Sequence, residues 1–347
     1  MGPPRDGPPL RPIAVSLHHR PQTGTCQGVL LGVARARLVT IESIAMLLRI
    51  PASRSPVKRL SRGAMPQIDR IAVYMSRSIE ELQVIAKRIR REIVEMTGAA
   101  KSGHPGGSLS AVEIVVELFF NHMKIDPKNP HWPDRDRFIL SKGHAAPVLY
   151  AAMAEAGYPD TPIDKLNTLR KLGSVYQGHP DVRFIPSLEA STGSLGEGLS
   201  LALGMGIAAR LDGRASRTFV MLGDGEIQEG QIWEAAMAGA FHKLDNVVAI
   251  VDYNGIQLDG FVKDIMEVAP LAEKWRSFGW HTLEIDGHDP RVVRQSFEEA
   301  ARTKGKPTCI VAHTVKGKGV SFMENNPKFH GVAPTPAEVA LALQELQ

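Results

Sequence analysis

The stretch "LGDGEIQEGQIWEAAMAGAFHKLDNVVAIVDYNGIQLDG", residues 222–260, decides the fold. A short apolar run, "TFVML" at 218–222, leads into it, and a second apolar run, "NVVAIV", lies at 246–251. The segment from 227 to 244 between them is predicted to be a helix. A strand, a helix and a second strand, with both strands short and apolar, form a βαβ unit, so the sequence predicts a parallel sheet.

Further strands and helices are predicted on both sides of this unit. The apolar runs "RFIL" at 137–140 and "CIVAHTV" at 309–315 predict two more strands. From Met75 onward, apolar residues recur at three- and four-residue spacing and predict an amphipathic helix. They are Ile79, Leu82, Ile85, Ile89 and Ile93. We therefore expect an α/β fold over residues 75–347, with a parallel sheet sandwiched by helices.

Two helix starts carry a capping pattern. Ser110 with Glu113 predicts a capping box ahead of "AVEIVVELFF". Near the end of the chain, Thr335, Pro336 and Glu338 occupy the N-cap, N1 and N3 positions of a final helix.

A ridge of small residues repeats every four positions within "STGSLGEGLSLALGMGIAAR". Its members are Gly196, Ser200, Gly204 and Ala208. Such a slim face lets another backbone approach closely, so we expect it to pack inside the protein or at a subunit interface.

Composition narrows the class of protein. The chain has 347 residues, of which 43% are hydrophobic, enough for one large or two ordinary domains with a sizeable core. The two cysteines, Cys26 and Cys309, indicate neither a disulfide framework nor a zinc site, and a reducing, cytoplasmic location is expected. Apolar runs fall short of the roughly 20 residues of a membrane helix, so no membrane partner is expected.

Residues 1–74 differ from the rest. They hold 11 Lys+Arg against 3 Asp+Glu, and 9 of the 24 prolines. This segment is predicted to be disordered, as an organellar transit peptide, a flexible extension or the product of a misassigned start codon. The basic charge of the chain belongs to this leader, so no nucleic-acid partner is inferred.

Asp224 and Asn254 follow two neighbouring strands of the predicted sheet. Because the carboxyl ends of parallel strands meet at one edge, we expect these residues to lie close together. Carboxylate, amide and backbone oxygens suit Mg²⁺ or Ca²⁺, and Mg²⁺ keeps positions for phosphate oxygens. A Gly-Asp-Gly sequence alone is usually an ordinary turn, but the second strand with its Asn favours a metal site that holds a diphosphate.

Gly-Asp-Gly followed 30 positions later by Asn resembles the thiamine-diphosphate-binding motif. The resemblance implies that Asp224, Asn254 and the Ile256 carbonyl bind the metal and that Gly225 binds the diphosphate. Six loops together resemble the N-terminal half of transketolase, encoded here as a separate chain, and the likeness covers residues 75–340. The loops are "SGHPGGSLSAVEI", "RDRFILSKGHAAPVLY", "GHPD", "STGSLGEGLSLALGMGIA", "DGEIQEGQIWEA" and "FHGVAP".

The resemblance implies a transferase of the pentose phosphate pathway that moves a two-carbon ketol group from a ketose phosphate to an aldose phosphate. Its cofactors would be thiamine diphosphate and Mg²⁺, with Ca²⁺ or Mn²⁺ as possible substitutes. His104, His179 and His330 would contact sugar hydroxyls or take their protons, since imidazoles titrate near neutral pH. His144 would lie near the diphosphate and the reacting carbons.

Four further positions have two interpretations each. Gly193 and Leu195 would contact the aminopyrimidine of the cofactor, or serve simple packing. Glu229 resembles a glutamate that links the two cofactor sites across the dimer, although a solvated carboxylate at a helix start is the alternative. Lys316 would reach the cofactor or a phosphate, unless it is a surface lysine. His288 and His313 are assigned to structure.

The family's activating glutamate lies on a second domain, and none follows in this sequence. We therefore expect the chain to be inactive alone and to need a transketolase C-terminal-type subunit in an α₂β₂ heterotetramer. The sugar-phosphate pocket belongs to that missing half, so the individual sugars are not predicted. Alternatives are a deoxyxylulose-phosphate synthase-like enzyme, a pyruvate dehydrogenase-type subunit, and a non-catalytic homologue that has kept the fold.

Overall fold

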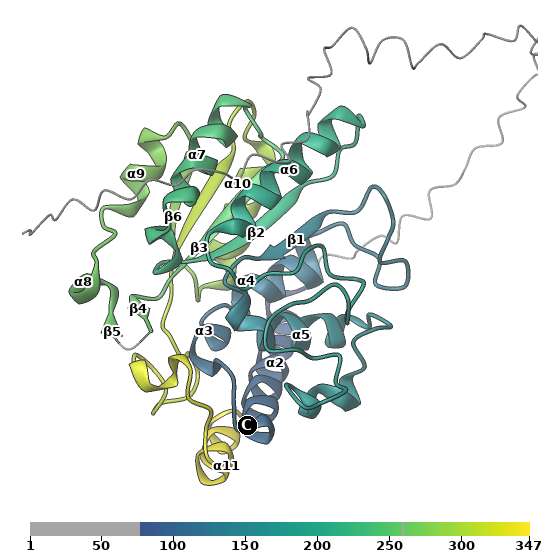
Figure 1. The fold of residues 1–347 in the computed structure, drawn as a ribbon, viewed down its shortest axis with the longest axis vertical. Coiled ribbons are helices and arrows are strands. Elements are labelled where there is room, and N and C mark those ends of the chain that lie inside the picture. Colours follow the sequence, from purple (N-terminus) through teal and green to yellow (C-terminus); the bar gives the residue numbers. More distant parts are fainter. Residues whose placement is uncertain (1–76, 259) are drawn as a thin grey trace, which may run out of the picture. The chain divides into compact units, whose positions relative to one another are not determined.

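The computed structural model describes residues 77–258 and 260–347 (Figure 1). The predicted leader, residues 1–74, and the predicted domain start at Met75 lie outside the described residues. Within the described part, none of the helices is both long and apolar enough to cross a membrane.

Five parallel strands form the central sheet, in the order β1-β2-β3-β7-β6. The strands are β1 (Arg137–Leu140), β2 (Thr218–Gly223), β3 (Val247–Tyr253), β6 (His281–Asp286) and β7 (Thr308–His313). The predicted parallel sheet is confirmed, with boundaries shifted by one or two residues. The strands β2 and β3 are neighbours in register from Thr218 opposite Val247 to Gly223 opposite Asp252.

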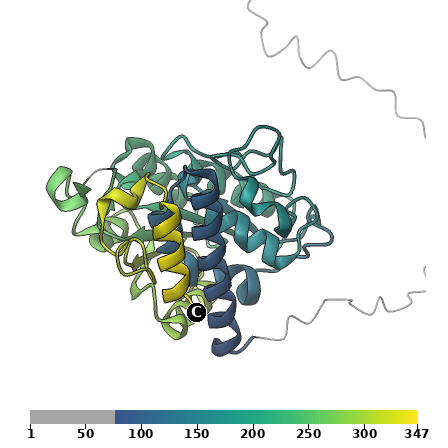
Figure 2. The same cartoon turned by 90° about the horizontal axis from the view of Figure 1, so that it is seen from below.

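Helices cover both faces of the sheet (Figure 1). One face carries α2 (Ile79–Ala100), α4 (Val112–Glu117), α5 (Ala146–Ala156), α10 (Pro290–Arg302) and α11 (Pro336–Glu345). The other carries α6 (Glu197–Leu211), α7 (Gly230–Phe241) and α9 (Leu271–Ser277). Seen from below, α11 lies beside α2 (Figure 2). The predicted sandwich of helices around a parallel sheet is therefore confirmed.

The four strands β1, β2, β3 and β7 supply both cores, whereas β6 contributes apolar side chains to one. Along β3, Val248 and Ile250 point into one hydrophobic cluster, whereas Val247, Ala249 and Val251 point into the other. Successive side chains of a strand face opposite sides of a sheet, so a strand covered on both faces is apolar throughout. This is why the central strands form continuous apolar runs in the sequence.

Short elements complete the chain between these layers. They are α3 (Pro105–Leu109), η1 (Leu118–His122), η2 (Gly143–Ala145), η3 (Ile163–Thr168), η4 (Glu226–Gln228), β4 (Ile256–Gln257), β5 (Gly260–Phe261), α8 (Val262–Ile265) and η5 (Pro327–His330). The helix predicted from 227 to 244 is thus split, with the single turn η4 ahead of α7. The hairpin of β4 and β5 follows β3 directly and carries Ile256.

The first turns of α11 and α2 are each capped by two residues that lie three positions apart in the sequence. The predicted cap of α11 is confirmed: the Glu338 N–H donates to Thr335 Oγ1 at 3.2 Å, and the Thr335 N–H donates to Glu338 Oε2 at 2.8 Å. Ser78 and Glu81 form the same reciprocal pair at the start of α2. The predicted amphipathic face of α2 buries Leu82, whereas Ile79 at its first position is half-buried.

The capping box predicted for Ser110 and Glu113 is wrong. Helix α4 begins after Ala111 without any side-chain cap, since α3 runs almost directly into it. The Ser110 hydroxyl instead donates to Asp252 at 2.6 Å, and Glu113 pairs with Arg90 and with His288. Charged partners from distant elements outcompete the local cap, because hydrogen bonds to ionised groups are the stronger ones.

Of the predicted small-residue ridge, only Gly196 packs inside the chain: it is buried just ahead of α6, and a Cβ there would lie 2.9 Å from Glu229 Cβ. Ser200, Gly204 and Ala208 are exposed, and a Cβ placed on Gly204 would meet no atom within 4 Å. The buried face of α6 instead carries Leu199 and Leu203, among others. Internal packing is therefore wrong as a prediction for the three ridge residues within α6, and the alternative of a subunit interface stays a prediction for them.

Candidate active site

The carboxyl edge of the sheet brings together the polar residues that follow its central strands. Asp224 follows β2 and Asn254 follows β3, and the Gly255 N–H donates to Asp224 Oδ2 at 2.5 Å. The two residues are thus neighbours in space despite their separation in the chain, as the βαβ crossover predicts.

Asp224 is a buried carboxylate, with 2% of its surface exposed. Its Oδ1 accepts the Gly225 N–H at 2.8 Å. Burial, followed by the negative charge of Asp252, raises the pKa of Asp224 to about 6. A buried anion of this kind calls for a cation, because burial penalises an uncompensated charge.

Asp252, the last but one residue of β3, anchors this edge. It is fully buried and accepts hydrogen bonds from Ser110 Oγ at 2.6 Å and Asn254 Nδ2 at 2.9 Å, and also from Lys142 and Thr314. Burial alone would raise its pKa, but the Lys142 ammonium and the hydrogen bonds hold the pKa below its usual value.

This carboxylate also orients Asn254. A carboxylate can only accept, so the atom of Asn254 that faces Asp252 is the amide nitrogen. The amide oxygen is left on the other side, where it accepts the Ile256 N–H at 3.2 Å. Sequence reasoning missed Asp252, although an acidic residue within the apolar run of a doubly covered strand was a usable signal.

Two buried lysines supply the positive charge of the edge. Lys142 follows β1 and donates to the Gly107 carbonyl at 2.7 Å as well as to Asp252. Lys316 follows β7 and donates to the Ile256 carbonyl at 2.7 Å. Burial lowers the pKa of Lys316 to about 8, a shift that the charge of Asp224 partly opposes. The alternative of a surface lysine at 316 is wrong, because its exposure is 2%.

The oxygen donors of this edge fit a hard divalent cation. Asp224 offers a carboxylate, Asn254 an amide oxygen and Ile256 a backbone carbonyl. A cationic group, the Lys316 ammonium, already faces this set. In the described part of the chain no three His, Cys, Asp or Glu side chains cluster as a metal site, which leaves oxygen donors of mixed type as the possible ligands.

Three histidines from three separate loops gather beside this edge. The ring centroids of His104 and His144 lie 5.1 Å apart, those of His104 and His330 5.4 Å, and those of His144 and His330 5.2 Å. Burial, with help from nearby positive charges, lowers the pKa of His104 to about 4 and of His330 to about 3, and lowers that of His144 well below its usual value. All three are neutral at pH 7.

The tautomer of His330 follows from its neighbour. Lys316 Nζ lies 2.9 Å from His330 Nδ1. An ammonium group can only donate, so Nδ1 accepts and the ring proton is on Nε2. His330 therefore presents an N–H donor on its far side.

His179 and Gly193 lie against each other at the rim of the site. A Cβ on Gly193 would come within 3.0 Å of the His179 ring, and the φ of Gly193 is +146°, so both space and backbone require glycine there. Burial and then the charge of Arg170 lower the pKa of His179.

The remaining predicted positions surround this edge. A Cβ on Gly225 would lie 2.7 Å from Gln257 Cβ, so glycine lets the β4–β5 hairpin approach Asp224 closely. Leu195 is 36% exposed, and Glu229 is exposed at the start of α7. A buried carboxylate that sequence reasoning missed, Glu226, accepts the N–H groups of Gly196 and Gly223 and thereby ties these loops together.

Comparison with known proteins decides the family. The sequence model described as "Transketolase, thiamine diphosphate binding domain" matches residues 81–346. The chain belongs to the transketolase family. This transketolase domain is 44% identical over 273 residues to the 6-deoxy-6-sulfo-D-fructose transketolase subunit SqwG of Clostridium sp. (strain MSTE9), covering 79% of this chain and 98% of that protein.

Other transketolase relatives differ in length. One of the subunits of the apulose-4-phosphate transketolase of Phocaeicola vulgatus is 39% identical, over 77% of this chain and 94% of its own length. The transketolase of Campylobacter jejuni superposes with a TM-score of 0.74 at 32% identity, over 78% of this chain but 43% of its own. The relatives are transketolases or transketolase subunits, which are transferases, and the matched domain binds thiamine diphosphate.

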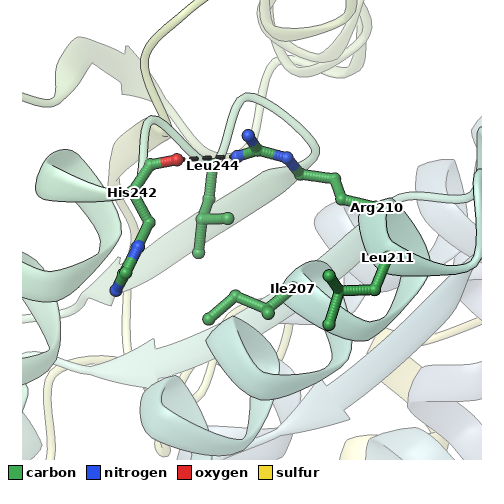
Figure 3. A pocket seen from close by; sticks show the side chains of 5 residues that line it. All are labelled: Ile207, Arg210, Leu211, His242 and Leu244. Atoms are coloured by element: carbon green, nitrogen blue, oxygen red, sulfur yellow. Dashed lines mark hydrogen bonds between the residues drawn. The ribbon is translucent and has the colours of Figure 1, made fainter.

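A cavity of about 260 Å³ lies away from the candidate site (Figure 3). Ile207, Leu211 and Leu244 form its apolar wall, at the carboxyl ends of α6 and α7. In a βαβ unit the helices run antiparallel to the strands, so these helix ends lie at the opposite edge of the sheet from Asp224. Arg210 donates there to the carbonyls of His242 at 2.6 Å and Lys243 at 3.2 Å, which satisfies the end of α7.

His288 has a structural role, as expected. Its Nε2 accepts the Val315 N–H at 2.8 Å, and its Nδ1 lies 3.0 Å from Glu113. Since Nε2 accepts, the proton is on Nδ1 and points at the carboxylate. This pair fixes the loop that carries Lys316. His313 pairs with Glu284 at 2.7 Å on a half-exposed surface.

Proposed function

We propose that this chain is the thiamine diphosphate-binding subunit of a two-chain transketolase that moves a two-carbon ketol group from a ketose to an aldose. The observation that carries the proposal is the juxtaposition of Asp224 and Asn254 with the three neutral histidines. Support for the two-chain form comes from relatives named as subunits, of which this chain covers 94% and 98%.

In this proposal Mg²⁺ is held by Asp224, Asn254 and the carbonyl of Ile256, with Ca²⁺ or Mn²⁺ as substitutes. The burial of Asp224 and the fixed amide of Asn254 support it, because both side chains are already held in place by hydrogen bonds to their neighbours. Lys316 then gives up its hydrogen bond to Ile256 and is free to face a phosphate oxygen.

Bound thiamine diphosphate supplies a nucleophilic carbon and an electron sink for cleaving the carbon–carbon bond next to a ketone. The chain's own residues hold it. Gly225 and the start of η4 would receive the diphosphate, while Gly193 and Leu195 would line the aminopyrimidine. The glycines permit the backbone to approach, as their close neighbours Gln257 and His179 indicate.

The neutral histidines would handle the sugar hydroxyls. His330 offers its Nε2–H as a hydrogen-bond donor to a sugar oxygen. His144, whose ring lies 5.1 Å from that of His104 and 5.2 Å from that of His330, would donate or accept a proton at the reacting carbons. His104 and His179 would contact the more distal hydroxyls. Neutral imidazoles suit this work, because they can accept a proton without first losing one.

The acid that activates the cofactor would come from a C-terminal-type partner, and Glu229, exposed at the start of α7, would face the network that joins two cofactor sites. We infer an α₂β₂ assembly in a cytoplasmic setting. The exposed ridge on α6 supports the existence of a further interface.

The substrate class is a ketose with an anionic group at its far end. This inference is supported by relatives named for a sulfonated ketose and for a ketose phosphate. The anion would be bound mainly by the partner subunit. Xylulose 5-phosphate, 6-deoxy-6-sulfofructose and apulose 4-phosphate are therefore the donors to compare.

The test is co-expression with a C-terminal-type partner encoded beside this gene, followed by assay of the three donors with an aldose phosphate acceptor. We expect ketol transfer by the pair in the presence of thiamine diphosphate and Mg²⁺, and none by either chain alone. The variant Asp224→Ala should abolish transfer, whereas Asp264→Ala, an exposed carboxylate in α8, should not. Transfer by this chain alone, or none by the pair with any donor, would contradict the proposal.

A further inference from the structure

Arg170 lies at the rim of the site, in the segment that follows η3. Its φ is +60°, a left-handed backbone that is unfavourable for a residue with a side chain. The Arg170 N–H donates to the carbonyl of Tyr176 at 2.8 Å, and Tyr176 is fully buried. The fold therefore holds this residue in an unfavourable conformation, which fixes the point from which its side chain departs.

The guanidinium group joins two loops of the site. Nη1 donates to Ser102 Oγ at 3.0 Å, two residues before His104. Nη2 donates to the Gly178 carbonyl at 3.4 Å, one residue before His179. One side chain thus joins a hydroxyl near His104 to the backbone next to His179.

Gly178 makes room for this contact. A Cβ on Gly178 would lie 3.1 Å from Cζ of Arg170 and 3.2 Å from its Nη2. The backbone of the His179 loop therefore lies directly against the guanidinium group. Any side chain at 178 would have to push the guanidinium or the loop away.

The same group also faces the ring of His104. Nη2 lies 3.5 Å from His104 Nδ1. A guanidinium group has only donors, so it favours a lone pair on Nδ1 and disfavours a proton there. The ring proton is then on Nε2, and a Cβ on Gly331 would lie 3.6 Å from that atom, so glycine keeps the space beside it clear of a side chain.

The charge of Arg170 acts in the same direction on both rings. Burial is the largest cause of the lowered pKa of His104, which is about 4, and the charge of Arg170 is the second largest. The same charge also lowers the pKa of His179. The other groups that face His104 are His179, Lys316, His144 and His330. None of these neighbours is anionic, so none of them favours the imidazolium form.

We propose that Arg170 is a positioning residue that ties together the loops of His104 and His179 and holds His104 as its Nε2–H tautomer. In this form His104 donates a hydrogen bond to a sugar oxygen instead of accepting a proton through Nε2. The role toward the sugar rests on the proposed function, whereas the tautomer is a property of the chain itself.

The direct test is nitrogen-15 NMR of the full chain with labelled histidine, with His104 assigned from the variant His104→Gln. We expect wild-type His104 to carry its proton on Nε2 at neutral pH. In Arg170→Met we expect a mixture of both tautomers and raised pKa values for His104 and His179, because a positive charge is removed. A wild-type His104 protonated on Nδ1 would overturn the proposal, whether or not the variant folds.

Two matched variants separate charge from structure. Arg183→Met makes the same replacement at an exposed arginine that lies four positions after His179 and pairs with Asp181. It should leave the pKa values and tautomers of both histidines unchanged. Arg170→Lys keeps the cation and the same left-handed backbone demand, and should keep the pKa values of both histidines low. Equal shifts in Arg183→Met and Arg170→Met would overturn the proposal.

The assembled enzyme gives a second readout. Activity that needs neutral His104 is lost as pH falls through its pKa, so the acidic limb of the kcat profile should move to higher pH in Arg170→Met and return in Arg170→Lys. An unmoved limb in an active Arg170→Met enzyme would overturn the role toward the sugar. Absence of activity in the wild-type pair would instead refute the proposed function and leave the NMR result standing.

Discussion

At the scale of single residues, one buried carboxylate organises the site. Asp252 accepts hydrogen bonds from Lys142, Ser110, Thr314 and Asn254, which come from the loops after three strands and from the end of α3. A buried ion pair adds little net stability over an apolar pair, but removing one partner leaves the other charge uncompensated. The main effect of Asp252 on the site is that it fixes the orientation of the Asn254 amide.

We expect Asp252→Ala to lower the free energy of unfolding by about 3–5 kcal/mol, because Lys142 would be left as an unpaired buried cation. Chemical unfolding followed by circular dichroism measures this. Asp264→Ala breaks an exposed pair with Lys263 and should change stability by at most about 1 kcal/mol. Similar losses in the two variants would show that Asp252 and Lys142 are not a buried, mutually dependent pair.

The raised pKa of Asp224 makes the stability of the fold change with pH in the direction opposite to that caused by most carboxylates. Its pKa is raised to about 6 in the folded chain, from 3.8. The folded state therefore binds more protons than the unfolded state between these values, so stability falls as pH rises from about 4 to 6. A difference of about two units corresponds to about 3 kcal/mol.

Without divalent cations, Asp224→Asn should therefore remove an electrostatic penalty of up to about 3 kcal/mol at pH 7.5 and a smaller one at pH 5. At both pH values it also loses one of the two backbone N–H bonds that the carboxylate accepts, because an amide nitrogen cannot accept. Urea unfolding at the two pH values, in a chelator, measures the difference. An equal effect at both pH values would mean that Asp224 is not the group that titrates.

At the scale of elements, the β4–β5 hairpin closes the site over Asp224. A Cβ on Gly225 would lie 2.7 Å from Gln257 Cβ, so the hairpin can take its place only beside a glycine. The carbonyl of Ile256, at the first position of β4, depends on that placement.

Gly225→Ala should destabilise the chain by about 1–3 kcal/mol through overpacking and weaken thiamine diphosphate binding in the presence of Mg²⁺. Gly230→Ala, at the start of α7, provides the matched control, because a Cβ there meets no atom within 4 Å. Thermal unfolding and cofactor titration of both variants check this. Equal behaviour would place the hairpin away from the metal ligands.

The local pattern of apolar and polar residues in the sequence predicted some helices and strands but not others. The strands β1, β2, β3 and β7 were predictable because burial on both faces leaves a continuous apolar run. The hairpin of β4 and β5 was not, since two-residue strands have no periodicity to detect. The cap of α11 was found because both partners are local, whereas Ser110 and Glu113 bond to groups 142 and 175 positions away.

The site divides in the same way. Asp224 and Asn254 follow from residue type and strand order, whereas the histidine loops were found through the resemblance to transketolase. Lys142, Asp252 and Arg170 act through contacts that only the folded chain brings together. Of these three, Asp252 alone had a local signal in the sequence, as an acidic residue in a strand that is covered on both faces. The resemblance to transketolase covered the residues that we propose contact ligand, not the residues that position them.

At the scale of the whole molecule, one face of α6 remains uncovered. Ser200, Gly204 and Ala208 are exposed, and Leu201 beside them is 40% exposed. An α₂β₂ assembly requires interfaces beyond that between the two kinds of chain, and this ridge is where another backbone could approach closely.

Gly204→Arg should leave the isolated chain folded, because nothing lies within 4 Å of a Cβ there, yet should reduce the mass of the assembly with its partner. Size-exclusion chromatography with light scattering measures the mass. Leu172→Arg, at a fully exposed position outside α6, should leave it unchanged. An α₂β₂ mass retained by Gly204→Arg would remove α6 from the interface.

The most direct measurement for the whole account is an anomalous difference map from a crystal of the assembled pair grown with Mn²⁺ and thiamine diphosphate. We expect a single strong peak in each copy of this chain, at about 2.0–2.2 Å from an Asp224 carboxylate oxygen, Asn254 Oδ1 and the Ile256 carbonyl, and in contact with the diphosphate. A map with bound diphosphate but with the metal peak elsewhere, or with no peak at these three oxygens, would contradict it.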